Sequence, residues 1–375
     1  LIVASATGYT FREVRTFLLS YNASGTGQDS RLLMLYKEGQ RHDQTLMSFL
    51  DLFPNVERHY VKTNAASSAR GEETESASVS QHPAAFRFKF LLDYLKDSVQ
   101  QGNIPCNVLS TDTRDVYFQD NYFQQVYGFL QRTEVKTSQG EDYIIYAKES
   151  GDKKNDPGKM MGTCRHHRKT AEQCFRPLTG ESNFERFMDN PILCSGTITA
   201  STRAFIALLS AMEVAVNTLT SLTRNPKCLK APMTDQLIYN LVTYEAESTR
   251  NKSFSWLPDE HRKNLAKVTK MFPSNFETPA FTLARVKKSQ LTLKWGSVSS
   301  SSGTQHRRSD QPVLVVRGEN STERNAIPAL VHMYDRNVDM SIAIRKGLQC
   351  FENQKYGDNG SEKRSYKGPP RIFKS

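Results

Sequence analysis

The stretch LIVASATGYTFREVRTFLLSYN, residues 1–22, decides the fold class. Its first five residues, Leu1–Ser5, form an apolar run with the length of a buried strand. After Gly8 the apolar residues recur at the spacing of one helical face. These residues are Phe11, Val14, Phe17, Leu18 and Tyr21. The stretch therefore predicts a strand followed by a helix.

The same unit of strand and helix repeats along the first third of the chain. The alternation predicts an α/β fold, with a Rossmann-type, mainly parallel sheet flanked by helices on both faces. Ligands bind such sheets beyond the carboxyl ends of the strands. Residues 63–81 are rich in Ser, Ala and Glu, which predicts a loop or lid. The further predicted strands are Leu32–Tyr36, Val56–Val61 and Asn107–Ser110, and the further helices are Leu46–Phe53, ended by Pro54, and one that begins at Pro83.

The rest of the chain is less regular and predicts a mixed C-terminal part. Residues 150–182 are a polar insert of unpredicted structure, and residues 286–310 contain a predicted flexible connector. Ser195-Gly196 predicts a tight turn after the strand Ile192–Cys194. The tail from Asn353 is basic and poor in apolar residues, which predicts a loosely held end. The other expected elements are strands at Tyr143–Ala147, Pro312–Val316 and Ile327–Val331, a long helix capped by Ser201 or Thr202, and a helix from Thr234.

Length and composition indicate a folded globular protein. The chain has 375 residues, of which 38% are hydrophobic and 24% charged, and this excludes wholesale disorder, a collagen-like repeat and a disulfide-dense miniprotein. No stretch approaches the ~18 consecutive apolar residues of a membrane span. Because the sequence opens inside a predicted strand without Met, we expect any anchor or targeting segment to lie outside it.

Charge and cysteine usage bear on partners and compartment. The net charge of +11 suits an anionic partner, such as an acidic polysaccharide, a nucleic acid or a phosphate-bearing substrate, or else only a soluble basic surface. The six cysteines form no C-x-x-C pair, which argues against a zinc ribbon or a thioredoxin-type motif. Cys164 and Cys174 are the expected disulfide if the compartment is oxidising. Four N-x-[ST] sequons in predicted loops, at Asn22, Asn251, Asn320 and Asn359, suit a secretory-pathway chain.

The sharpest motif is Asp112-Thr113-Arg114-Asp115, at the end of the fourth predicted strand. Two carboxylates at this edge of a sheet offer hard oxygen ligands to Mg²⁺ or Mn²⁺, and such an ion could hold a diphosphate. Alternatively, Asp112 caps a helix and Asp115 pairs with Arg114 at the surface.

Three further groups could carry chemistry. His332 follows a predicted strand and could join the same metal, or it could be an ordinary hydrogen-bonded histidine. Ser195 and Gly196 could let the backbone approach a sugar or phosphate, or could form only a turn. Asp235, beside Gln236, could be a general base for an acceptor hydroxyl, or only a favourable carboxylate in the first turn of a helix.

Taken in order, these blocks resemble a GT-A-type glycosyltransferase. The matching blocks are His82-Pro83 before the R-F-x-F helix Arg87–Phe90, then STDTRDVYFQ, ILCSGT, TDQLIYN and LVHMYDR. They are similar to a group of nucleotide-diphospho-sugar transferases with an SDxRDVxFQ signature, a CSG turn, a DQ pair and a VHQYDR-like end. Here the acidic motif is D-x-x-D where D-x-D is commoner, Met333 replaces a frequent Gln, and the 150–182 insert has no assigned counterpart.

The resemblance implies a role for each site residue. Asp112, Asp115 and His332 would bind Mn²⁺ (or Mg²⁺). Residues 1–125 would be the donor-binding half, 126–352 the acceptor-side half of the same GT-A domain, and 353–375 a tail. The implied donor-binding residues are Ala4, Ser5, Ala6, Thr7, Gly8, Arg87, Asp112, Arg114, Ser195 and Gly196, and the implied acceptor-binding residues are Asp235, also the catalytic base, and Gln236.

The resemblance thus implies a metal-dependent hexosyl- or pentosyltransferase that uses a nucleotide-sugar donor, with UDP the expected nucleotide. The acceptor would be a glycan, glycoprotein or glycolipid, no nucleic acid partner is expected, and the expected location is the Golgi or ER lumen with a type II anchor. One alternative is a non-catalytic glycan- or polyanion-binding module on the same fold, whose affinity would fall steeply with salt. A dehydrogenase or kinase is disfavoured, because the chain has neither G-x-G-x-x-G after its first strand nor G-x-x-x-x-G-K-[ST].

Overall fold

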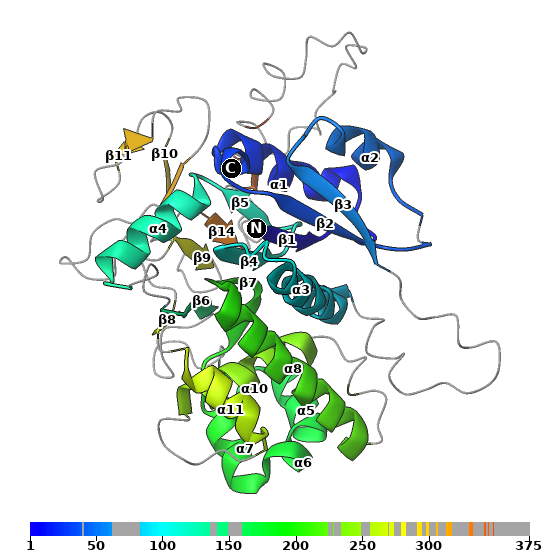
Figure 1. Cartoon of the computed structure of the whole chain (residues 1–375), viewed down its shortest axis with the longest axis vertical. Coiled ribbons are helices and arrows are strands. Elements are labelled where there is room, and N and C mark those ends of the chain that lie inside the picture. Colours follow the sequence, from blue (N-terminus) through cyan, green and yellow to red (C-terminus); the bar gives the residue numbers. More distant parts are fainter. Residues whose placement is uncertain are drawn as a thin grey trace, which may run out of the picture.

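The computed structural model shows an α/β fold built on one seven-stranded sheet flanked by helices (Figure 1). The structure describes residues 1–39, 41–61, 83–135, 141–148, 160–223, 228, 234–248, 256–268, 270–273, 279–282, 291–294, 298–299, 305–306, 313–316, 330–332, 341, 342, 344 and 348. The predicted lid at 63–81 and the tail from Asn353 lie outside these residues, as does Met333-Tyr334-Asp335-Arg336.

The main sheet is mixed but mostly parallel, as the alternating pattern predicts. Its strand order is β3-β2-β1-β4-β7-β6-β8, and β7 alone runs opposite to its neighbours β4 and β6. Within it, β1, β2, β3 and β4 are parallel, and so are β6 and β8. The strands are β1 (Ile2–Ser5), β2 (Leu32–Lys37), β3 (Val56–Val61), β4 (Asn107–Thr111), β6 (Tyr143–Lys148), β7 (Leu193–Ser201) and β8 (Lys270–Pro273).

Helices cover both faces of this sheet, because successive residues of each buried strand point to opposite sides. On β1, Val3 packs into a core with α3, α8 and α10, whereas Ile2 and Ala4 pack into a second core with α1, α2 and α4. The helices are α1 (Phe11–Ala23), α2 (Gln44–Leu50), α3 (Pro83–Gln100), α4 (Tyr122–Arg132), α5 (Arg165–Cys174), α6 (Arg176–Thr179), α7 (Glu181–Met188), α8 (Thr202–Thr223), α10 (Thr234–Ser248) and α11 (Asp259–Ala266), with a short 3₁₀ helix η1 (Thr26–Gln28).

Small sheets complete the fold. The three-stranded sheet β5-β14-β9 places β14 between two strands that are distant from it in sequence. The described part of 286–310, which is predicted to contain a connector, holds the short strands β10, β11 and β12, and the rest of that range lies outside the described residues. The strands are β5 (Val116–Phe118), β9 (Ala280–Thr282), β10 (Leu291–Lys294), β11 (Val298–Ser299), β12 (Gln305–His306), β13 (Val313–Val316) and β14 (Leu330–His332).

Other details of the predicted pattern also need correction. Ser195-Gly196 is no turn: it lies inside β7, where the pairing with β6 shifts register between Tyr146 and Ala147. The described part of the polar insert is helical from Arg165 onward. Asn22, predicted in a loop, lies in the last turn of α1.

The disulfide joins Cys174 to Cys228, so the predicted pairing of Cys164 with Cys174 is wrong. Cys164 is the N-cap of α5 and Cys174 is its last residue, and a helix of this length holds its two ends about 15 Å apart. A disulfide needs Cα atoms within about 7 Å of each other. The observed bridge ties the end of α5 to the segment before α10.

One described helix is long and apolar enough to cross a membrane by composition alone. This is α8, whose window Thr202–Leu219 has a mean hydropathy of 1.2 and is 50% buried. It packs against α3, α10 and α11 as part of the core.

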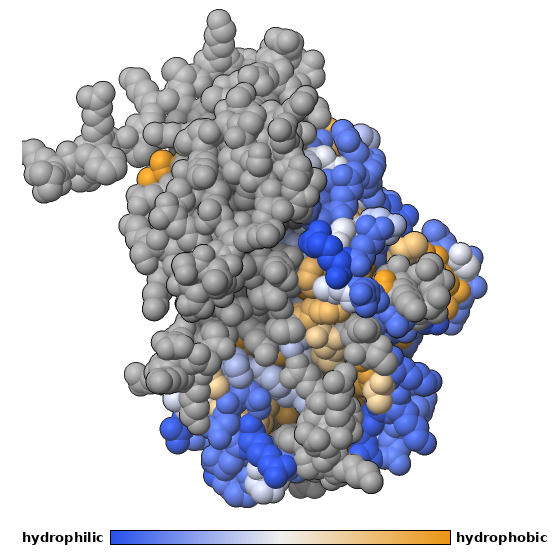
Figure 2. Space-filling view, turned by 90° about the vertical axis from the view of Figure 1, so that its left-hand side faces the viewer, coloured by the Kyte–Doolittle hydropathy of each residue, from blue (hydrophilic) through white to orange (hydrophobic). Residues whose placement is uncertain are grey.

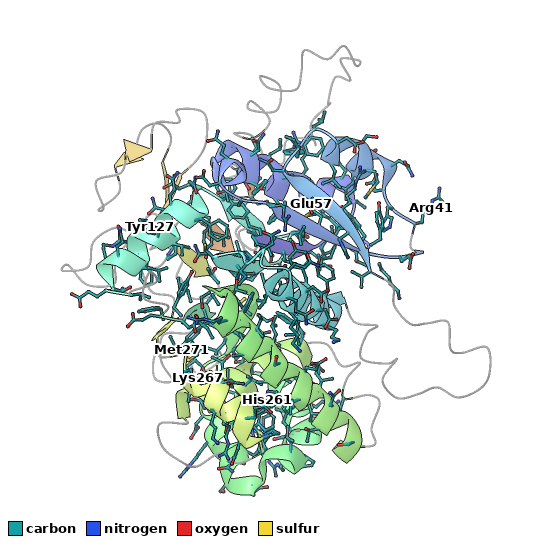
Figure 3. All side chains as sticks on the ribbon, viewed as in Figure 1. Arg41, Glu57, Tyr127, His261, Lys267 and Met271 are labelled. Carbon is teal, nitrogen blue, oxygen red and sulfur yellow. A yellow bond between two sulfur atoms is a disulfide. The ribbon has the colours of Figure 1, made fainter. Side chains whose placement is uncertain are left out.

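Much of the described surface on the face shown in Figure 2 is hydrophilic. On the face shown in Figure 2, hydrophobic residues gather in a strip between hydrophilic regions above and below it. Large exposed apolar side chains are scattered over several elements, as Tyr127 on α4 illustrates (Figure 3).

Candidate metal centre

Asp112 stands at the carboxyl end of the buried strand β4, where the sequence predicts it. Its backbone N–H donates to the carbonyl of Gly196, 2.8 Å away, and this contact continues the pairing of β4 with β7. The turn that follows is tied to β1, because the hydroxyl of Thr113 donates to the carbonyl of Ser5 over 2.7 Å. Asp112 is therefore fixed at the edge where parallel strands end.

Asp115 and His332 meet through strand pairing. Asp115 immediately precedes β5, and β5 pairs with β14 so that Val116 lies opposite His332. This pairing brings the histidine to the acidic turn, as the resemblance implies.

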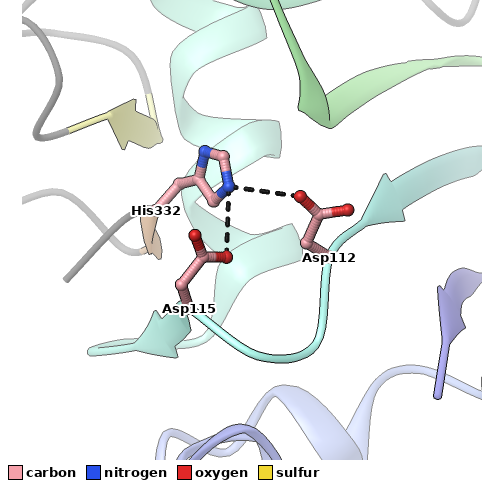
Figure 4. Close-up of side chains that lie close together, drawn as sticks. All are labelled: Asp112, Asp115 and His332. Carbon is pink, nitrogen blue, oxygen red and sulfur yellow. Dashed lines mark ion pairs between the residues drawn. The ribbon is translucent and has the colours of Figure 1, made fainter. Parts of the chain in front are cut away.

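The three side chains converge on one point (Figure 4). The Nε2 atom of His332 lies 3.4 Å from Oδ2 of Asp112 and 3.3 Å from Oδ1 of Asp115. A cation about 2.1 Å from each of its ligands holds neighbouring ligand atoms about 3.0 to 3.4 Å apart. These separations therefore suit a shared ion.

The donor atom of the histidine is buried without a hydrogen bond. His332 is 2% exposed, and its Nε2 has no hydrogen-bond partner among the described residues. A buried polar atom that makes no hydrogen bond is costly, and a cation shared with the two carboxylates that contact this nitrogen is one explanation for it. Asp112, Asp115 and His332 thus form a group that could hold a metal ion.

Arg87 holds Asp112 in place from α3. Its Nη1 lies 2.5 Å from Oδ1 of Asp112, and its Nη2 donates to the carbonyl of Ser195 over 3.0 Å. Partial burial raises the pKa of Asp112, but Arg87 and His332 outweigh it and hold that pKa well below its ordinary value. The resemblance implies a donor-binding role for Arg87, whereas in this structure its guanidinium is buried and contacts Asp112 and the β7 backbone.

Cys194 contacts the other ring nitrogen of His332. Its Sγ lies 3.2 Å from Nδ1, inside the buried core, and sequence reasoning missed this contact. Burial lowers the pKa of His332, but Cys194, Asp115 and Asp112 together raise it well above the ordinary value. The surroundings therefore favour positive charge at this point, either as a proton on the ring or as a bound cation.

Gly196 has no side chain, and this leaves room for the side chains of Asp112 and His332 beside it. A Cβ at this position would lie 2.6 Å from Cε1 and 2.7 Å from Nε2 of His332, and closer still to Oδ2 of Asp112. Real Cβ atoms essentially never approach so closely. Only glycine fits here without displacing a ligand.

Asp235 and Gln236, which the resemblance assigns to the acceptor, lie in different surroundings. Asp235 lies near the site, since the hydroxyl of Ser195 donates to its Oδ2 over 3.4 Å. Gln236 is buried: its Nε2 donates to the carbonyl of Leu193 over 2.8 Å, and its Oε1 lies 3.2 Å from Nε2 of His167. The structure gives Gln236 a framework position, so we no longer expect it to contact an acceptor.

The loop Ala4–Gly8 leaves β1 beside the acidic turn, with Ala4 and Ala6 buried and Gly8 exposed. Arg114 is exposed on the turn itself. Tyr9 is a neighbour that sequence reasoning missed: burial, and then the charges of Asp112 and Asp115, raise its pKa. Its place directly after the loop is the only sequence signal that could have indicated it.

The sequence matches no protein-family model and no curated protein. What the site does is therefore inferred from its geometry and chemistry.

Proposed function

We propose that the protein is a metal-dependent glycosyltransferase of GT-A type. It would transfer a hexose or pentose from a nucleotide-diphosphate-sugar, with UDP the expected nucleotide, to a hydroxyl of a glycan, glycoprotein or glycolipid. One observation carries the proposal: two carboxylates and an imidazole converge at the carboxyl edge of the parallel strands, where such sheets bind ligands.

Asp112, Asp115 and His332 would hold the ion, for which oxygen-rich ligation favours Mn²⁺ or Mg²⁺. When bound, such an ion neutralises the negative charge that develops on a departing diphosphate. The chain prepares the ligands in advance: Arg87 fixes the Asp112 carboxylate, and Cys194 fixes the ring of His332. Preorganised ligands cost little reorganisation when the substrate reacts.

Asp235 is the proposed base for an acceptor hydroxyl. Its contact with Ser195 lies in the same segment of β7 as Gly196, which lies against the side chains of Asp112 and His332. Taking the proton from the attacking hydroxyl serves a transferase that inverts the anomeric centre, whereas retention needs no such base. The backbone of Ser195 and Gly196 would lie beside the donor sugar, and Ala4–Gly8 beside the base of the nucleotide.

The secretory-pathway lumen remains the proposed location. The disulfide between Cys174 and Cys228 supports it, because such bonds persist in oxidising compartments.

The test is a donor screen. The protein is incubated with each common nucleotide sugar, with Mn²⁺ or with excess EDTA, and released nucleoside diphosphate is quantified. Release from one donor, abolished by EDTA and by Asp115→Asn but retained in Asp93→Asn, is the expected result; Asp93 is a matched control because it forms an exposed ion pair on α3. Absence of release from every donor, with salt-sensitive glycan binding that ignores EDTA, would favour the binding module instead.

A further inference from the structure

Outside the metal centre, a thiol, an imidazole and an amide lie in successive hydrogen-bond contact. Cys164 Sγ lies 3.1 Å from Nδ1 of His167, and Nε2 of the same ring lies 3.2 Å from Oε1 of Gln236. The three residues come from the N-terminal end of α5 and the first turn of α10.

The orientation of the Gln236 side-chain amide determines which atom donates in each of these hydrogen bonds. The carbonyl of Leu193 can only accept, so the Gln236 atom 2.8 Å from it is the Nε2 donor, and Oε1 faces His167. Oε1 can only accept, so Nε2 of His167 carries the proton. In the neutral ring Nδ1 then carries a lone pair that can accept the proton of the Cys164 thiol.

Gln236, which faces the ring of His167, is hydrogen-bonded to a backbone carbonyl that is itself fixed by Asn240. The carbonyl of Leu193 also accepts from Nδ2 of Asn240 over 2.8 Å, and the backbone N–H of Leu193 donates to Oδ1 of Asn240 over 2.7 Å. Gln236 and His167 are both buried, whereas Cys164 is partly exposed. A buried base thus contacts the thiol of a partly exposed cysteine.

We propose that Cys164 is a nucleophilic thiol and a site of covalent modification by soft electrophiles such as the sulfur of a small disulfide. His167 is the base, and Gln236 is the positioning residue that orients it. Nucleophile, base and orienting group in hydrogen-bond contact are the recognised signature of an activated nucleophile. Cys164 is also the N-cap residue of α5, where the helix dipole favours negative charge.

The reaction balances without a further oxidant. The thiol proton of Cys164 passes to Nδ1 of His167, and the sulfur attacks one sulfur of the small disulfide. A new S–S bond forms to Cys164 as the original S–S bond breaks, and the departing thiolate takes up the proton from His167. Cys164 is oxidised, the released half of the disulfide is reduced to a thiol, and a mixed disulfide remains.

The test compares cysteines within one folded protein. Iodoacetamide labelling is followed by peptide mass mapping between pH 5.5 and 8.5, with exposed Cys106 as the internal reference and buried Cys194 as the reporter of unfolding. We expect Cys164 to label at least about tenfold faster than Cys106 at pH 6.5, where an ordinary thiol is only about 1% thiolate. Oxidised glutathione should likewise add one glutathionyl group at Cys164.

Two variants make the result decisive. His167→Gln should reduce labelling of Cys164 at pH 6.5 to the rate of Cys106, while Cys106→Ser should leave Cys164 unchanged. Intact Cys174–Cys228 and slow labelling of Cys194 verify that His167→Gln is folded. Equal rates and pH profiles for Cys164 and Cys106 in the wild-type protein, or unchanged labelling in folded His167→Gln, would show that the three residues are only structural.

Discussion

Gly196 and His332 lie so close that a methyl group on the glycine would lie 2.7 Å from Nε2 of the histidine. Gly196→Ala is therefore expected to push His332 away from the two carboxylates and to weaken binding of Mn²⁺ at least about tenfold, because ligand placement controls metal affinity. Calorimetric titration with Mn²⁺ measures this. Gly128→Ala, within helix α4, is the matched control and should bind as the wild type does.

Removal of a ligand charge should have a larger effect. Asp115→Asn keeps the shape of the side chain and leaves the Arg87–Asp112 pair intact, so we expect loss of Mn²⁺ binding in a protein that still folds, with a lower metal-free melting temperature because buried His332 loses one of its two carboxylate partners. Asp112→Asn should also lower the free energy of unfolding, by about 1 to 2 kcal/mol, since it leaves buried Arg87 without a charged partner. This is less than the cost at a fully buried pair, because Asp112 is 41% exposed and solvent screens it. Metal-free and Mn²⁺-loaded thermal melts of both variants check these effects, and undiminished Mn²⁺ stabilisation in Asp115→Asn would contradict the metal centre.

Cys194 is expected to act on the metal through His332. In Cys194→Ala the ring loses its contact at Nδ1, and Mn²⁺ affinity should fall by about 10- to 100-fold, as for other residues that orient ligating histidines. Cys194→Ser retains a hydrogen-bonding atom and should recover part of that loss. Equal affinities for the alanine and serine variants would mean that a hydrogen-bonding atom at this position does not orient the ring.

Glu245 should make stability depend on pH. Burial raises its pKa from an ordinary value of 4.5 to about 7, although the charge of Arg262 opposes this. The folded state therefore favours the protonated acid, and the stability that Glu245 contributes is present below pH 4.5 and is lost as the pH rises through about 7. Glu245→Gln stays neutral, so its melting temperature should fall less than that of the wild type between pH 4.5 and pH 8. The exposed Glu260→Gln should follow the wild-type curve.

The disulfide of Cys174 and Cys228 closes a long loop, with 54 residues of separation in sequence. Replacement of both cysteines by serine should lower the free energy of unfolding by about 2 to 4 kcal/mol. Denaturant titration measures this change, with Cys106→Ser as an exposed control. Peptide mapping that finds Cys164 bonded to Cys174 would overturn the observed pairing.

Local sequence pattern predicted the first half of the fold well. The strands β1 to β4 and helices α1 to α3 are each specified by neighbouring residues, such as the apolar run Leu32–Tyr36 or the helical spacing after Gly8. Asp112 and Asp115 could be assigned because the end of a parallel strand is itself a local feature.

Non-local features were not predictable from pattern. The contact of Cys194 with His332 depends on where β7 and β14 lie in space. The burial of Arg87 against Asp112 likewise cannot be read from spacing, and the resemblance alone implied a donor role for it. Ser195-Gly196 has the composition of a turn, but pairing with β4 extends the strand through it. GT-A type, transferase activity and Golgi location all remain predictions.

The central place of β14 between β5 and β9 also orders events during synthesis. Chains emerge from the ribosome N-terminus first, so the two carboxylates exist long before their imidazole does. Until residues 330–332 arrive, both neighbouring strands lack the partner that joins them. An ion that needs all three ligands can therefore bind only after residues 330–332 have been made, and its binding would report that β14 has already joined β5.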